Sequence, residues 1–170
     1  VAPGLGMTLA DLEAQQALLV VGSDLRQDAP IAAHRVRKAA VAGADAFFYY
    51  FCHYEYLFPV AGYLDTTSSS IIDELAGLVR AAFARTETQP DANLEEVLAA
   101  AEVRPEHEAV VAKLIAAERA TVLLGLIAGR HPGYSRIRML AAALAAVTGA
   151  QVGSLTEGAN SSGAASAGTL

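Results

Sequence analysis

The sequence has one cysteine, Cys52, among its 170 residues. A single thiol cannot form a disulfide within the chain, so nothing indicates an oxidising compartment. An iron–sulfur cluster takes about four cysteine ligands, so this chain alone cannot hold one. A metal site at Cys52, His53 and Glu55 lacks further ligands, and a nucleophilic pair of Cys52 with His34 or His131 lacks a third, orienting group. We favour a buried thiol beside a strand end.

Long apolar runs are also missing, since none reaches the roughly 18–20 residues that cross a bilayer. The first residues, Val1–Gly4, have neither the basic nor the apolar region of a signal peptide. We therefore expect no direct membrane insertion. The net charge is −6, and an acidic chain with scattered basic residues predicts no nucleic-acid partner.

The common nucleotide and zinc motifs are incomplete. Gly4–Leu9 begins like a dinucleotide fingerprint, but Leu9 replaces the third glycine and no strand precedes it. There is no Gly-Lys-Ser/Thr phosphate loop. His107–Val111 begins like a zinc-protease motif, but Val111 replaces the second histidine.

Apolar residues are plentiful: they make up 54% of the chain, and the mean hydropathy is +0.35. Soluble domains usually have about 45–50%. Much of the excess is alanine, a strong helix former. We expect this chain to bury apolar surface against a neighbour and to self-associate when isolated.

Hydrophobic patterning predicts an α/β fold, a Rossmann-like parallel sheet flanked by helices. The runs Ala17–Gly22, Ala46–Phe51 and Ala120–Leu126 are typical of strands buried on both faces. The segment His53–Thr67 is expected to be irregular, because Pro59 and Gly62 interrupt it. Helices are predicted over Leu9–Gln16, Pro30–Val41, Ile71–Arg85, Asn93–Ala101, Pro105–Arg119 and Ser135–Thr148, with a last strand at Gln151–Gly153. Residues 1–157 would form the domain, and the Gly/Ala/Ser-rich residues 158–170 a flexible segment.

Two segments repeat one pattern. Leu18–Ala44 and Val122–Ala150 each run from a strand through a glycine, a loop and a proline to a helix that bears two arginines and ends at Gly-Ala. The pattern indicates either an internal duplication or the cues that any α/β unit shares.

Two basic segments are candidates for contacts. His34–Lys38 either meets a phosphate or a partner, or forms a solvated helix face with salt bridges to the chain's many acids, which we favour. Arg130–Tyr134 follows a strand, where α/β folds bind ligands, or it is simply a turn that opens a helix.

The order of these features resembles a known family. A strand ending in Gly22-Ser23-Asp24 is followed by a Pro30-opened helix with Arg35-Val36-Arg37-Lys38-Ala39. Further motifs occur at Arg138–Ala141, Ala146–Gly149 and Thr156–Asn160. Together they are similar to the molybdopterin oxidoreductases. They resemble in particular the molybdopterin-oxidoreductase-like region found in one iron–sulfur-bearing subunit of complex I, the NADH-quinone oxidoreductase (NADH dehydrogenase).

The resemblance implies that Gly22, Ser23 and Asp24 form a vestigial pterin-nucleotide loop. In cofactor-binding relatives this loop ends in Asn and the next strand in Asp-Pro-Arg. Here Asp24 adds a negative charge, and Phe47–His53 lacks the triad. We expect no molybdopterin, other cofactor, metal or catalytic residue in this fragment.

The resemblance also implies a role. The chain would be part of an oxidoreductase of respiratory electron transport from NADH to quinone. It would be a fragment serving as a cofactor-free scaffold in the peripheral arm, on the cytoplasmic side of a bacterial membrane. It would contact the rest of its own subunit, expected to carry iron–sulfur clusters, and neighbouring complex I subunits. The fragment itself is not expected to be catalytic. Two alternatives are the cofactor cradle of an active molybdopterin oxidoreductase and a free-standing nucleotide-binding module.

Overall fold

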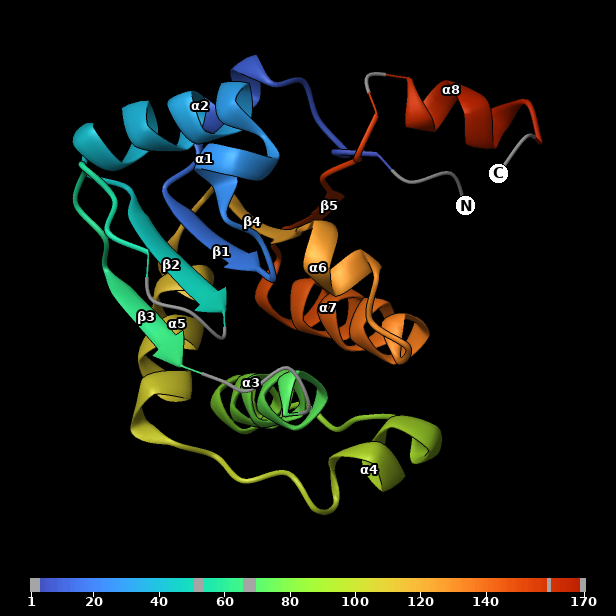
Figure 1. The fold of residues 1–170 in the computed structure, drawn as a ribbon. Coiled ribbons are helices and arrows are strands. Elements are labelled where there is room, and N and C mark those ends of the chain that lie inside the picture. The colour runs from blue at the N-terminus through green and yellow to red at the C-terminus, as the bar shows by residue number, and fades with distance from the viewer. Residues whose placement is uncertain (1–3, 51–53, 66–69, 159, 169–170) are drawn as a thin grey trace.

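The computed structural model describes residues 4–50, 54–65, 70–158 and 160–168 (Figure 1). Cys52 and His53 lie outside these residues, so the interpretations made for them stay predictions. The elements in chain order are η1 (Ala10–Ala14), β1 (Ala17–Val21), α1 (Leu25–Asp28), α2 (Pro30–Val41), β2 (Asp45–Tyr50), β3 (Gly62–Asp65), α3 (Ile71–Thr86), α4 (Ala92–Leu98), α5 (Pro105–Ala116), β4 (Ala120–Leu124), α6 (Leu126–Gly129), α7 (Tyr134–Thr148), β5 (Gln151–Ser154) and α8 (Ser161–Ser166).

The strands form one parallel sheet in the order β3-β2-β1-β4-β5. β1 is central: Val20 pairs with Phe48 of β2 on one side and with Leu123 of β4 on the other. All five of its residues are buried, as expected for a parallel strand covered on both faces. The predicted fold class, a Rossmann-like parallel sheet flanked by helices, is confirmed.

The two faces of the sheet carry separate hydrophobic cores. α3, α5 and α7 cover one face, while η1, α1 and α2 lie on the other (Figure 1). Neighbouring residues of β1 alternate between them, so Leu19 belongs to the first core and Val20 to the second. This alternation follows from the two-residue period of a strand.

The connection from β2 to β3 differs from the other connections between the parallel strands. Its described part, residues 54–61, contains no helix, and aromatic side chains occupy the space over the sheet. Tyr56 stacks on Phe48 of β2 with ring centroids 4.3 Å apart, and Phe58 lies 5.0 Å from Tyr56. These rings cover β2 on the same face as α2.

The structure corrects two local expectations. Gly62–Asp65, expected to be irregular, forms β3, because pairing with Phe47–Tyr50 outweighs the nearby Pro59 and Gly62. The predicted first helix is the 3-10 helix η1. The segment from residue 158 includes α8 in its described part, and both the domain boundary at 157 and the flexibility expected beyond it stay predictions. No helix in the described part of the chain is long and apolar enough to cross a membrane.

Candidate functional site

The first place to look for a ligand site is the carboxyl edge of the sheet between β1 and β4. The chain leaves β1 toward β2 and returns to β4, so the strand order reverses here, and α/β folds usually bind ligands at this point. The sequence-predicted loop Gly22–Asp24 follows β1, and Gly125 follows β4 directly.

The two loops at this point contact each other directly. The Gly125 N–H donates to the Val21 carbonyl at 2.8 Å, and the Ile127 N–H donates to the Gly22 carbonyl at 3.0 Å. Gly22 has a φ of +67°, which favours glycine. A Cβ at Gly125 would lie 2.2 Å from Cβ of Ser23. The backbone of α6 and its preceding glycine therefore fills the space between the ends of the two strands.

The side chains of the predicted loop turn toward α1. Ser23 and Asp24 are only 2% and 4% exposed. The Ser23 hydroxyl donates to the Asp28 carboxylate at 2.9 Å. Asp24 accepts from the Arg26 N–H at 3.1 Å and from the Gln27 amide at 2.9 Å. Asp24 thus caps the start of α1, and Ser23 contacts its last residue. The interpretation of Gly22, Ser23 and Asp24 as a vestigial nucleotide loop stays a prediction.

The second candidate loop, Arg130–Tyr134, opens α7. The His131 Nδ1 accepts from the Gly133 N–H at 2.9 Å. Arg130 forms an exposed ion pair with Glu157. Such contacts fit the interpretation of this loop as a helix-opening turn.

A cavity of about 520 Å³ lies near this edge, between the start of α2 and the end of β5. Its wall is mostly apolar, and its two charged residues are Asp28 and Glu157. Asp28 is engaged by Ser23, and Glu157 by Arg130. A wall whose charged groups are carboxylates disfavours a phosphate-bearing ligand.

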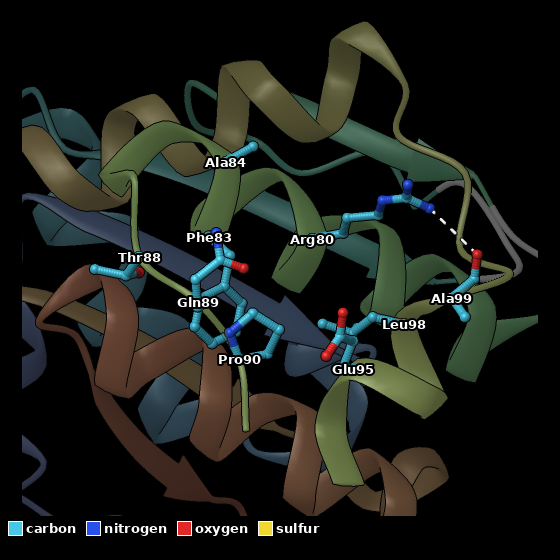
Figure 2. A pocket seen from close by; sticks show the side chains of 9 residues that line it. All are labelled: Arg80, Phe83, Ala84, Thr88, Gln89, Pro90, Glu95, Leu98 and Ala99. Carbon is cyan, nitrogen blue, oxygen red and sulfur yellow. Dashed lines mark hydrogen bonds between the residues drawn. The ribbon is translucent and has the colours of Figure 1, made fainter. Parts of the chain in front are cut away.

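A second cavity, of about 350 Å³, lies between the C-terminal half of α3 and α4 (Figure 2). Arg80 lies at its rim and donates to the carbonyls of Ala99 and Ala101 at 3.4 and 2.8 Å. Arg80 therefore ties the end of α4 to α3. Glu95, on α4, lines the same cavity, and the described residues of the wall include no nucleophile paired with a base.

A buried polar cluster joins α3 to the start of α5. His107 is 1% exposed, and its Nε2 lies 2.9 Å from a Glu74 carboxylate oxygen. Its Nδ1 accepts from the Arg104 N–H at 3.2 Å, and the Arg104 guanidinium contacts the same carboxylate. Both ring nitrogens are engaged, so His107 caps α5 and links it to α3. The histidine of the incomplete zinc motif therefore has a structural role.

The basic segment on α2 is divided between two environments. Arg35 and Lys38 both pair with Glu13, Lys38 at 2.7 Å, as the salt-bridge interpretation predicts. His34 and Arg37 instead line a groove of about 370 Å³ beside the 54–58 loop. Sequence reasoning missed this groove, because nothing in the pattern brings α2 next to a loop that follows β2.

The described residues hold no cluster of metal ligands. No group of three or more His, Cys, Asp or Glu side chains among them could hold a metal ion. Any site that involves Cys52 or His53 lies outside those residues.

Comparisons with known proteins give a fold match. No protein-family model matches the sequence, and no curated protein matches it. The fold is similar to a chain in the crystal structure of the formyltransferase/hydrolase complex FhcABCD from Methylorubrum extorquens, determined with methylofuran, with a TM-score of 0.53 and 15% identity. The match covers 90% of this chain and 39% of that chain, so this chain spans less than half of its neighbour's length. At this identity the likeness establishes the fold alone.

These findings correct the resemblance to a subunit of complex I. The matched structure belongs to a formyltransferase/hydrolase complex, and no family model supports a molybdopterin oxidoreductase or an NADH dehydrogenase. The predicted role in electron transport to quinone is therefore wrong, and both alternatives are without support. The physical reason lies in the motifs: a strand ending in glycine, a proline-opened helix and a closing glycine are common to many doubly wound sheets. These motifs therefore indicate the fold class, but they do not distinguish one family from another within it.

Proposed function

We propose that this chain is a non-catalytic scaffold domain in a multi-subunit assembly of the formyltransferase/hydrolase kind. The observation that carries the scaffold role is the pair of backbone hydrogen bonds from Gly125 and Ile127 across the strand ends. A site that binds ligand at this point needs an open crevice between the loops. Here the polypeptide fills it, and Ser23 and Asp24 are engaged with α1.

The kind of assembly is suggested by the fold match, which extends over 90% of this chain. The partners would be other parts of the same protein and neighbouring subunits. Two properties are consistent with such packing: the high apolar content and the exposed aliphatic side chains Ile31, Val41 and Leu57. A cytoplasmic location belongs to the same proposal, because the one cysteine of this chain cannot form the internal disulfide that an oxidising compartment favours.

The test is to purify the full-length protein that contains this chain from its native cells, through an affinity tag. Native mass spectrometry gives the composition, and release of formate from a formylated amine gives the activity. We expect stoichiometric partners and activity in the assembly, with none from the protein alone. An active lone protein would refute the scaffold role, and a lone protein in the cells would refute the assembly.

A further inference from the structure

The groove between α2 and the 54–58 loop combines an apolar wall with cationic side chains. Its lining residues are Arg26, Pro30, Ala33, His34, Arg37, Leu57 and Phe58. Pro30, Ala33, His34 and Arg37 are spaced as one stripe along α2. At about 1.5 Å of rise per residue, the stripe is about 10 Å long, which is enough for two turns of a helix or a short extended segment.

Leu57 lies in solvent, although the residues on either side of it are held in place. It is 88% exposed, yet aromatic residues on both sides of it are packed on the sheet. The Tyr56 hydroxyl accepts from the Leu25 N–H at 3.3 Å, and its ring stacks on Phe48. Phe58 packs on Tyr56. An aliphatic side chain held outward in this way is a contact point for another apolar group.

The charges at the groove are not neutralised by the residues that the structure describes. Arg26 donates to the Glu55 carbonyl, at 3.2 Å. Arg37 has no ion pair with any described residue, whereas Arg35 and Lys38 on the same helix pair with Glu13. Uncompensated cations gather here although the whole chain carries −6. Charge complementarity therefore favours an acidic occupant.

We propose that this groove docks an acidic segment of a partner subunit, with an aliphatic or aromatic side chain against Leu57 and Phe58 and flanking carboxylates at Arg26 and Arg37. The inference rests on the proposed scaffold function and names the surface and the partner chemistry that it uses. A protein segment fits better than nucleic acid, because about half of the lining is apolar and an acidic chain repels a polyanion at long range.

The first test uses the full-length protein and a short fluorescein-labelled peptide of glutamates around one leucine, with binding followed by anisotropy. The double variant Arg26→Glu, Arg37→Glu should weaken binding about tenfold or more, and Leu57→Ser should also weaken it. The matched control is Arg136→Glu, an exposed arginine on α7, which should leave binding unchanged. Higher salt should weaken binding by the wild type.

Two comparison probes identify the occupant. A peptide of lysines around one leucine should not bind. A single-stranded oligonucleotide that binds more tightly than the acidic peptide would overturn the proposal in favour of nucleic acid. Equal peptide binding by the wild type and the double variant would also overturn it.

The second test separates this inference from the scaffold role. The double variant is expressed in place of the natural protein, and the assembly is isolated through the tag. Loss of partners from the double variant, but not from Arg136→Glu, supports the docking groove. Retention of all partners by the double variant refutes the groove alone, whereas a wild-type protein without partners refutes the scaffold function.

Discussion

The two faces of the sheet are covered in different ways. α3, α5 and α7 seal one face, and their contacts include the buried cluster of His107 and Glu74. On the other face, η1, α1 and α2 share the cover with a loop that has no helix in its described part. Leu57 of this loop lies in solvent beside two arginines that no described carboxylate pairs. We therefore expect the first face to supply most of the stability, and the proposed docking groove lies on the second.

The sharpest test of this difference exchanges one leucine for alanine on each face. Leu140 of α7 is fully buried in the first core. Leu140→Ala should cost about 2–5 kcal/mol, because it removes buried methyl groups and leaves a cavity. Leu57→Ala should change stability by no more than about 0.5 kcal/mol, because the side chain is exposed. Urea unfolding followed by circular dichroism gives both values, and equal losses would remove the distinction between the faces.

A smaller effect is expected at the junction of β1 and β4, where the loops close on each other. Gly125→Ala would bring a Cβ within 2.5 Å of the Gly22 carbonyl oxygen and still closer to Ser23. The overpacking should cost about 1–3 kcal/mol. Gly129→Ala is the matched control, since nothing lies within 4 Å of its added Cβ, and it should be neutral or slightly stabilising. A Gly125→Ala variant as stable as this control would mean that the crevice opens easily.

The sequence was enough to predict the parts of the fold that depend on local pattern. Pro30–Val41 is predicted with the bounds that α2 has, because proline and glycine delimit it, and β1 is within one residue. β3 was missed because its pairing with β2 is a tertiary contact that four residues after a proline do not reveal. The loop Gly22–Asp24 is correctly placed after β1, but its engagement with α1 and Gly125 depends on packing. The groove beside Leu57 could not be foreseen for the same reason.

The aromatic loop of the second face predicts a response to alkaline pH. Burial raises the pKa of the Tyr56 phenol above its ordinary value of about 10. The Tyr56 phenol therefore ionises at lower pH in the unfolded chain than in the folded one. The stability that the buried phenol contributes is complete below about pH 10 and is lost as the pH rises further. Tyr56→Phe should weaken this alkaline loss while costing about 1 kcal/mol near neutrality, because the Leu25 N–H loses its acceptor. Urea midpoints between about pH 8 and pH 11 measure both effects, and an unchanged alkaline slope would contradict the assignment.

The smallest expected effect is at acidic pH, where Thr8, just before η1, contacts Asp11 in η1 on the same face. The Thr8 hydroxyl and backbone N–H donate to the Asp11 carboxylate at 2.7 and 2.9 Å, and they lower its pKa below the ordinary 3.8, the hydroxyl most strongly. A lowered pKa in the folded state contributes stability that is present above the unfolded value and lost as the pH falls through the folded one. Asp11→Asn should therefore remove a small part of the acid destabilisation below about pH 4. Thr8→Val, which keeps the carboxylate and the backbone donor, should remove most of the same part, because the hydroxyl is the stronger donor. If Thr8→Val instead loses as much stability at acidic pH as the wild type does, the Thr8 hydroxyl does not lower the pKa of Asp11. The weaker packing that we infer for the second face would then also include the residues before η1.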